Sequence, residues 1–352
     1  MDLSVVVVNW NTRELLLRCL SALERELACL AEAGRLSSEI LVVDNGSGDG
    51  SADAVAERCP GARLIRLPEN RGYAAGNNAA LPLVRGRIVL LLNSDALVTP
   101  GALAACVEVL DATSGAGAAG PQLLHPNGHL QNSIHAFPSL WTELLPTLLL
   151  ELLLPKRFPS KRHFHQGPID VDAVLGAALF VSREAFEAVG PMPAEYFFFL
   201  EETEWCWRIR RAGFRVLHVP GARIVHLSGA SSKRKDPART RIEFHRSLYH
   251  FLRVHRGPAV VAAAAGARVA RGFLSLLLGC LLLPFSPRQR RRTRERWQLL
   301  RWHLWGCPAG WGLAPADWSP APAPAASGPQ GLDADPRTGK AQRSNLPGGG
   351  VE

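Results

Sequence analysis

Short apolar runs that end in polar residues alternate with helical patterns along the first hundred residues. The apolar runs, rich in Val, Leu and Ile, lie at 3–8, 39–45, 62–67 and 87–93. The helical patterns between them lie at about 11–30, 51–58 and 73–84. Strands that are apolar along their whole length are typical of parallel sheets covered on both faces. The sequence therefore predicts an α/β fold: a doubly wound, mostly parallel sheet with helices on both faces.

The later part of the chain is less regular at first and then becomes helical. A strand followed by a helix is predicted over 171–186, a helix over 201–213, and two short strands over 214–229 around Pro220-Gly221. Residues 242–305 show mainly helical patterns. We therefore expect a helical extension that follows the predicted sheet domain.

The charge of the chain is uneven. Its 352 residues carry a formal net charge of +9, and many of the basic residues fall in 233–241 and 288–297. The first 130 residues are close to balanced, which argues against a nucleic-acid groove on the predicted sheet. We therefore expect no nucleic-acid partner. An anionic membrane or a small anionic substrate remains as the candidate partner of the positive charge.

The cysteines indicate the compartment. The seven cysteines show neither paired spacing nor a metal-knuckle pattern, which favours a reducing, cytoplasmic location. Residues 1–11 have no basic segment before their apolar run, so we interpret them as a first strand and not as a signal peptide.

Polar residues gather where the predicted strands end. They are Asn9-Trp10-Asn11, Asp44-Asn45-Gly46 and Asn93-Ser94-Asp95. Ligands of open α/β sheets bind beyond the carboxyl ends of the strands. The sequence therefore places its candidate site at this edge.

The stretch "VVDNGSGDGSAD" (42–53) delivers Asp44 to a strand end. A carboxylate there can accept the ring N–H of a pyrimidine base, although an ordinary strand-to-helix turn would look the same. The glycines at 46, 48 and 50 have G-x-G-x-G spacing, not the G-x-G-x-x-G of dinucleotide-binding folds. No P-loop pattern occurs, and an NAD-dependent oxidoreductase is disfavoured.

The stretch "ENRGYAAGNNAAL" (69–81) suits a phosphate. Gly72 and Gly76 permit close backbone approach, and Asn70 and Asn77 offer amide groups before and within a helix. The amino terminus of a helix attracts anions. The alternative is simply a capped helix start.

Asp95 follows the apolar run 87–93 and is a hard oxygen ligand. In an extended segment Asn93 and Asp95 would point the same way. Such a pair could bind a Mg²⁺ or Mn²⁺ ion that also binds the oxygens of a diphosphate. Alternatively, Asp95 only caps the turn before Thr99-Pro100.

Five motifs in order carry a family resemblance. They are "SVVVVNWN", "VVDNGSGDGS", "NRGYAAGNN", "LLNSDALVTPGAL" and the stretch from "LGAALFVSREAF" to "ARIVHLSGAS" (175–231). Together they resemble family 2 nucleotide-sugar glycosyltransferases of the GT-A fold, and most of all the bacterial rhamnosyltransferase branch. The resemblance covers about residues 3–255.

The resemblance implies donor and metal sites. Asp44 would bind the nucleotide base, Asn93-Ser94-Asp95 would replace the family's D-x-D element, and Asp95 with His226 would bind Mg²⁺ or Mn²⁺. His226 could otherwise be a satisfied strand histidine. The residues assigned to the nucleotide-sugar are Asn9, Asn11, Asp44, Asn70, Gly72, Asn77, Asn93 and Ser94.

The acidic pair Glu201-Glu202 would be catalytic. Glu202 would be the general base that deprotonates an acceptor hydroxyl, so that the transfer inverts the anomeric configuration. The family more often has Asp at positions 202 and 204, where this chain has Glu. Glu204 can also pair with Arg208 one helical turn later.

The resemblance implies a sugar transfer. The donor would be a dTDP- or UDP-linked sugar, such as rhamnose, and the acceptor a glycan or lipid-linked glycan of a bacterial surface polysaccharide. The glutamate replacements leave an alternative: a catalytically impaired nucleotide-sugar-binding relative that acts as a membrane-surface scaffold.

The C-terminal region predicts membrane contact. Residues 272–285 are strongly apolar but shorter than the roughly 20 residues of a span. Extension back to Pro258 includes Arg268 and Arg271, which are costly at mid-membrane. An arginine cluster (288–296) and Trp297, Trp302 and Trp305 follow, which favours a helix lying on an anionic membrane over a span or a packed helix.

We therefore expect three parts. Residues 1–255 would form the GT-A domain, 256–312 an apolar and basic helical membrane-proximal segment, and 313–352 a disordered tail rich in Pro, Ala and Gly. The protein would be cytoplasmic and peripheral on the inner face of the plasma membrane. The sequence leaves the oligomeric state open.

Overall fold

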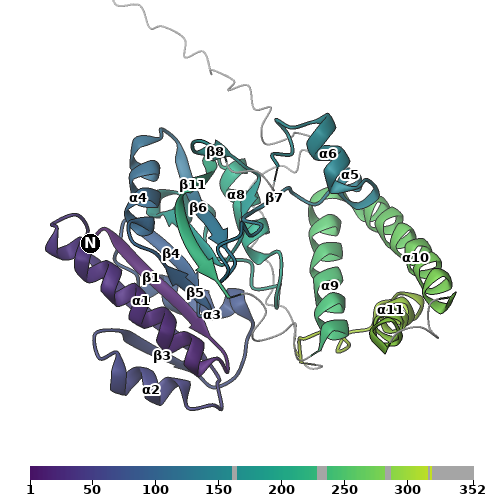
Figure 1. Cartoon of the computed structure of the whole chain (residues 1–352), viewed down its shortest axis with the longest axis horizontal. Coiled ribbons are helices and arrows are strands. Elements are labelled where there is room, and N and C mark those ends of the chain that lie inside the picture. The colour runs from purple at the N-terminus through teal and green to yellow at the C-terminus, as the bar shows by residue number, and fades with distance from the viewer. Residues whose placement is uncertain (161–164, 228–235, 282–286, 316–317, 319–352) are drawn as a thin grey trace, which may run out of the picture.

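A mixed nine-stranded sheet forms the centre of the N-terminal two-thirds of the chain (Figure 1). The computed structural model describes residues 1–160, 165–227, 236–281, 287–315 and 318. Within them the strand order is β3-β2-β1-β4-β10-β6-β11-β5, and β8 pairs with β11. The strands are β1 (Leu3–Asn9), β2 (Ser38–Asn45), β3 (Arg63–Leu67), β4 (Ile88–Asn93), β5 (Ala96–Val98), β6 (Ala116–Leu124), β8 (Ile169–Asp170), β10 (Ala178–Ser182) and β11 (Arg215–His226). A separate two-stranded sheet contains β7 (Ile134–His135) and β9 (Ala173–Val174).

Parallel pairing dominates the first half of the sheet. β1 pairs in parallel with β2 and β4, and β2 pairs in parallel with β3. β6 and β11 are also parallel, whereas β10 runs antiparallel to both of its neighbours, β4 and β6. The predicted α/β fold with a mostly parallel sheet is confirmed, with one reversed strand at its centre.

Helices cover both faces of this sheet. They are α1 (Arg13–Glu32), α2 (Ser51–Arg58), α3 (Tyr73–Ala80), α4 (Ala102–Ala112), α7 (Arg183–Val189) and α8 (Glu201–Arg211). Val5 and Val7 of β1 belong to a core shared with α1 and α4. Val6 and Val8 belong to a second core, shared with α3 and α8. Both faces of β1 are therefore buried, as the unbroken apolar runs predict.

Two local predictions are wrong. β11 runs from Arg215 to His226 as one strand, and Pro220-Gly221 lies in an irregularity where the register with β6 shifts. A bulge can hold a proline that has no amide hydrogen for the ladder. The helix predicted over 73–84 ends as an α-helix at Ala80 and continues as one 3₁₀ turn, η1 (Leu81–Leu83), which contains Pro82.

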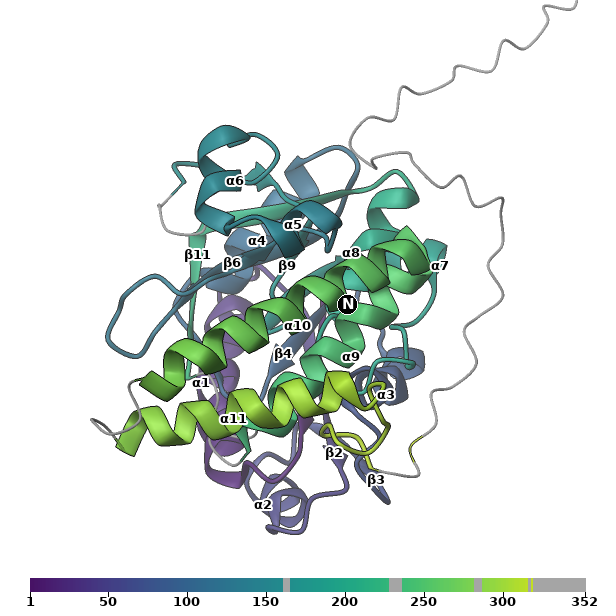
Figure 2. The same ribbon diagram turned by 90° about the vertical axis from the view of Figure 1, so that its right-hand side faces the viewer.

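A second group of helices packs against one side of the sheet domain (Figure 2). It contains α9 (Pro237–Arg256), α10 (Pro258–Leu281) and α11 (Pro287–Leu304), with the short helices α5 (Leu140–Leu144) and α6 (Thr147–Leu153). The predicted C-terminal helical extension is thus confirmed. Phe251 of α9 contacts Trp207 of α8, and Tyr249 of α9 stacks on Trp302 of α11. Helix α9 therefore joins the two groups.

The division of the chain after residues 255 and 312 stays a prediction. The first boundary lies at the end of α9, next to Gly257. The predicted tail, 313–352, lies outside the described residues except for 313–315 and 318.

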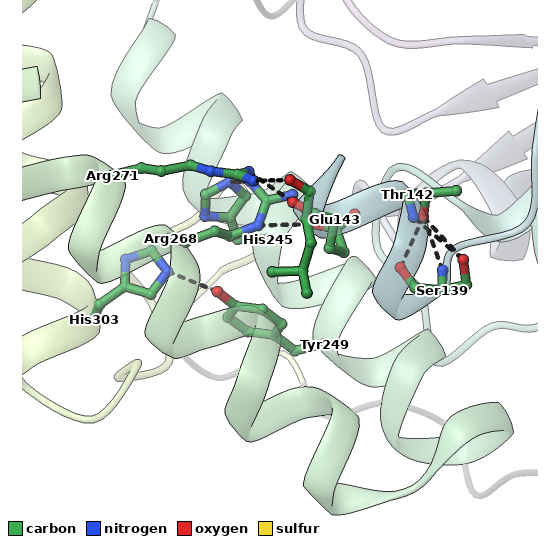
Figure 3. A network of polar contacts seen from close by, with 9 residues as sticks. Ser139, Thr142, Glu143, His245, Tyr249, Arg268, Arg271 and His303 are labelled. Carbon is green, nitrogen blue, oxygen red and sulfur yellow. Dashed lines mark hydrogen bonds and ion pairs between the residues drawn. The ribbon is translucent and has the colours of Figure 1, made fainter. Parts of the chain in front are cut away.

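A polar network fixes α10 to its neighbours (Figure 3). The guanidinium of Arg268 forms an ion pair with Glu143 of α5, and its Nη1 lies 2.6 Å from Nε2 of His245 on α9. Burial lowers the pKa of His245 well below its usual range, so the neutral ring accepts this bond. Arg271 donates to the carbonyls of Glu143 and Leu144 at 2.6 and 2.7 Å. The arginines of α10 are therefore occupied by protein groups.

Replacement of Glu143 by Ala should destabilise this junction. The change leaves the largely buried Arg268 guanidinium without its carboxylate, which costs about 3–5 kcal/mol. Urea unfolding followed by tryptophan fluorescence would measure the loss. Glu187→Ala removes the exposed pair with Arg183 and should cost less than about 1 kcal/mol. Equal losses in the two variants would contradict this account of the junction.

Candidate active site

The three predicted polar clusters meet at one edge of the sheet. The register pairs Asn9 with Asp44 across β1 and β2, and Val8 with Asn93 across β1 and β4. Parallel neighbours end at the same edge, so the residues after these strands become neighbours. The candidate site is therefore built at the carboxyl ends of β1, β2 and β4, as predicted.

Asp44 lies buried at the end of β2. Its Oδ2 accepts the amide N–H of Ser47 at 3.1 Å, and its Oδ1 accepts from Nδ2 of Asn9 at 3.4 Å. The side chain of Asp44 thus stabilises the turn after β2, as expected for an ordinary strand-to-helix turn. An ionised carboxylate has about four acceptor positions, so these two bonds leave it capacity for a ligand.

Asn11 serves the loops around Asp44. Its Oδ1 accepts the amide of Gly48 at 2.8 Å, and its own amide donates to Ser47 Oγ at 3.0 Å. The residue has φ 53°, and neither it nor Thr12 caps α1 through a side-chain bond. Thr12 Oγ1 instead donates to Asn9 Oδ1 and lies 2.9 Å from Ser94 Oγ. These hydrogen bonds tie Ser94 to the ends of β1 and β2.

Asn70 and Gly72 are held by the buried Asn45, which the sequence placed in a strand-end cluster without a role of its own. Its Nδ2 donates to Asn70 Oδ1 at 3.1 Å and to the Gly72 carbonyl at 3.0 Å, and its Oδ1 accepts from Arg71. Gly72 has φ 89°, and a Cβ there would lie 2.5 Å from the carbonyl oxygen of Phe197. The predicted close approach at Gly72 is thus made to the chain itself, at Phe197, shortly before the acidic pair Glu201-Glu202.

Asn77 is not presented to the site edge. It is fully buried within α3, and its Nδ2 donates to the Tyr73 carbonyl at 2.9 Å. Tyr73, which the sequence analysis did not assign, donates its hydroxyl to the Gly176 carbonyl at 3.0 Å. Burial and the negative charge of Glu201 raise the pKa of Tyr73. Tyr73 therefore links α3 to the acidic pair.

Asp95 and His226 lie side by side. Ser94 and Asp95 form a turn between β4 and β5, so the expectation of an extended segment from Asn93 to Asp95 is wrong. β5 pairs with β11, which places His226 opposite Ala96. Nε2 of His226 lies 3.2 Å from the Asp95 carboxylate. The residues that were predicted to share a metal are thus brought together.

Gln131 orients the ring of His226, and no motif or periodicity points to it. Its Oε1 lies 2.9 Å from Nδ1 of His226. Because Oε1 only accepts, Nδ1 carries the proton, and a neutral ring has its lone pair on Nε2, facing Asp95. The carboxylate and this lone pair then point at the same space.

Glu201 and Glu202 begin α8 after a left-handed turn. Phe199 and Leu200 have φ 72° and 67°, in the left-handed region that is unfavourable for non-glycine residues. Residues with such strained backbones cluster at functional sites. Glu202 accepts the amide of Gly176 at 3.4 Å, whereas Oε2 of the buried Glu201 has no hydrogen-bond partner among the described residues.

The two carboxyl groups differ electrostatically. Burial and the negative charge of Glu202 raise the pKa of Glu201 well above its usual range. Burial also raises the pKa of Glu202, and the Gly176 amide opposes this shift. The pKa of Glu201 is therefore raised more strongly than that of Glu202, which makes Glu202 the better candidate for an ionised carboxylate.

A cavity of about 660 Å³ lies beside Glu202 and His226. Both residues line it, together with Gln131. Its other walls come from α5, α6, α9 and the segment 157–159, through residues that include Leu150, Arg157, Arg241 and Phe244. Glu202 and His226, one member of each pair, therefore border one space.

Glu204 lies on the same helix but has another role. Its Oε2 accepts from Nε of Arg208 at 2.8 Å, which is the pairing one helical turn apart that the sequence predicts. Burial raises the pKa of Glu204, but the neighbouring His255 and the charge of Arg208 lower it overall. Glu204 therefore holds α8 in place and is not a second base.

Comparison with known proteins identifies the family. The model of glycosyl transferase family 2 matches residues 4–190. An N-acetylglucosaminyl-diphospho-decaprenol L-rhamnosyltransferase of Mycobacterium tuberculosis is 31% identical over 246 residues, which are 65% of this chain and 79% of that protein.

Two solved structures share the fold. The mannosyltransferase PcManGT from Pyrobaculum calidifontis, in complex with GDP-Man and Mn²⁺, is 20% identical with a TM-score of 0.51, over 86% of this chain and 87% of that one. GalNAc-T7 with UDP, GalNAc and Mn²⁺ is 16% identical with a TM-score of 0.52, over 87% and 56%. The chain therefore belongs to glycosyl transferase family 2, is a glycosyltransferase of the GT-A fold, and resembles bacterial rhamnosyltransferases.

Proposed function

We propose that the protein transfers a sugar, with inversion, from a nucleotide-diphospho-sugar to a hydroxyl of a glycan or lipid-linked acceptor. One observation carries this proposal: Glu202 and His226 line the same cavity, and His226 is in contact with Asp95. A base and a diphosphate site on either side of one space are what an inverting transfer requires.

The donor would lie along the strand ends. Asp44 would accept from the base, and Asn9, Asn70 and Ser94 would lie around the nucleotide. The mycobacterial relative is named as an L-rhamnosyltransferase that acts on a decaprenol-linked substrate. We therefore propose rhamnose on dTDP or UDP as the donor, a lipid-linked glycan as the acceptor, and a cytoplasmic site at the inner face of the membrane.

Asp95 and His226 fit a divalent cation. Nε2 of His226 and the Asp95 carboxylate lie 3.2 Å apart, close enough for both to bind one cation. The described residues contain no cluster of three His, Cys, Asp or Glu side chains, so diphosphate oxygens and water would complete the shell of Mg²⁺ or Mn²⁺. When bound, the metal would offset negative charge on the departing nucleotide diphosphate.

Glu202 would act as the general base from the opposite side. Its carboxylate borders the cavity in which we place the acceptor. The acceptor hydroxyl would give its proton to Glu202 as its oxygen attacks the anomeric carbon, and the nucleotide diphosphate would leave from the opposite face. Since the carboxyl must be ionised, activity should be lost as pH falls through the raised pKa of Glu202.

Glu202→Gln should abolish transfer but keep donor binding. Removal of a positioned base lowers rates by about 10²–10⁴-fold. Nucleotide release would be measured with dTDP- and UDP-sugars, Mg²⁺ or Mn²⁺, and a cell lipid extract. Glu204→Gln is the matched control and should stay within a few-fold of the native rate. If the native protein binds donor but never releases nucleotide, the scaffold alternative replaces this proposal.

Gln131→Leu should weaken metal binding without touching a ligand. Loss of the acceptor that fixes a histidine tautomer typically costs about 10–100-fold in metal affinity. Mn²⁺ binding in the presence of UDP, measured by electron paramagnetic resonance, gives a readout independent of turnover. Gln131→Glu keeps an acceptor oxygen at the Nδ1 position and should retain the affinity. Unchanged affinity in Gln131→Leu would remove His226 from the metal site.

A further inference from the structure

Helix α6 presents an apolar face to solvent. Four of its leucines, Leu148, Leu149, Leu152 and Leu153, are exposed, and Leu152 keeps 75% of its accessible surface. Their spacing of i, i+1, i+4 and i+5 places them on one side of the helix. The opposite side is buried through Leu150. Exposed leucines gathered in this way mark a binding surface.

Helix α10 repeats the pattern. Phe273, Leu274, Leu277 and Leu278 have the same spacing and are also exposed, with Leu277 at 66%. Arg271, one turn before Leu274, donates to the Leu144 carbonyl at the end of α5. Because α6 follows α5 directly, α6 lies near the part of α10 that carries Arg271 (Figure 1).

The other side of α10 is occupied by protein. Ala264 is fully buried, Gly272 packs against Leu300 of α11, and Arg268 pairs with Glu143 (Figure 3). By length and composition Pro258–Gly279 could cross a bilayer. A span would separate these contacts and place both arginines in hydrocarbon, which is costly. The geometry favours a helix that lies along a surface.

Basic side chains border the leucines. Nη1 of Arg296 on α11 donates to the Ser275 carbonyl of α10 at 3.1 Å, which places α11 against the leucine-bearing half of α10. The sequence from Pro287 to Leu304 has seven arginines and one glutamate. The side chains of Arg290, Arg291, Arg292 and Arg294 are exposed. A cationic rim around an apolar face complements anionic lipid headgroups over an acyl layer.

We propose that the leucine faces of α6 and α10, with the arginines of α11, form one docking surface for an anionic lipid bilayer. This inference deepens the proposed membrane location by assigning its contact surface, and it does not depend on sugar transfer. α6 is an unexpected part of this surface, because only the C-terminal segment was predicted to touch the membrane.

The surface is connected to the cavity. Thr147 and Leu150 of α6 line the cavity from the side opposite the exposed leucines, and Glu143 of α5 lines it as well. The same short segment thus has one face on the cavity and one face on the lipid. Docking would therefore bring the cavity to the membrane surface, where the hydroxyl of a lipid-linked acceptor lies.

The test is vesicle co-flotation of the full chain. Vesicles of phosphatidylcholine with phosphatidylglycerol should bind the protein, and pure phosphatidylcholine vesicles should bind it more weakly. Leu152→Gln/Leu277→Gln takes one exposed leucine from each helix and should lower binding about 10- to 100-fold, since one inserted leucine contributes roughly a factor of ten. Leu152→Met/Leu277→Met should retain binding.

The matched control is Leu130→Gln, an exposed leucine in a loop of the sheet domain, which should bind like the native protein. Native-like binding by the Gln double variant would overturn the proposal. So would a lipid-free native dimer that this variant converts to a monomer, because a second copy would then cover the leucines. Donor binding in solution should be unchanged, so failure of docking is distinguishable from failure of sugar transfer.

Discussion

Burial of both faces of the central strands is the constraint on which the rest of the structure depends. Val5 and Val7 face one core and Val6 and Val8 face the other, so the strand interior offers almost no place for chemistry. Unpaired polar groups there would be costly. The buried Ser4 of β1 accordingly donates its hydroxyl to the carboxylate of Glu39 at 2.6 Å. Polar side chains therefore collect where the strands end, and parallel pairing brings those ends together.

The strand ends could be predicted from sequence because the signal is local. Apolar runs mark β1, β2 and β4, and the polar residues after them follow directly in the chain. The contacts that complete the site are long-range: Gln131 reaches His226 from 95 positions away, and Tyr73 reaches Gly176 from 103. No periodicity encodes such pairs, so only the family resemblance pointed to His226, and Gln131 and Tyr73 were missed. Asn45 was named only as a member of a strand-end cluster.

Gly176 leaves space for the longer side chain of the glutamate at position 202. A Cβ added to Gly176 would lie 3.3 Å from Cγ of Glu202, tighter than ordinary contact. The missing side chain thus leaves room for the extra methylene that Glu has over Asp. Glycine also brings its amide to the carboxylate, which favours the ionised form that a base needs. The replacement of Asp by Glu is therefore accommodated and is weak evidence for lost catalysis.

The helical extension supplies walls of the site that the sheet domain does not provide. The sheet edge supplies Asp44, Asp95 and the strand-end loops, but it leaves the side of Glu202 away from the donor uncovered. α5, α6 and α9 build the walls there, and α9 joins them to α8 through the contact of Phe251 with Trp207. Arg268 and Arg271 hold α10 on α5 through short contacts with Glu143, and Glu143 itself lines the cavity. In the proposed arrangement, the donor enters from the aqueous edge of the sheet and the acceptor from the membrane side, and Glu202 lies where the two routes meet.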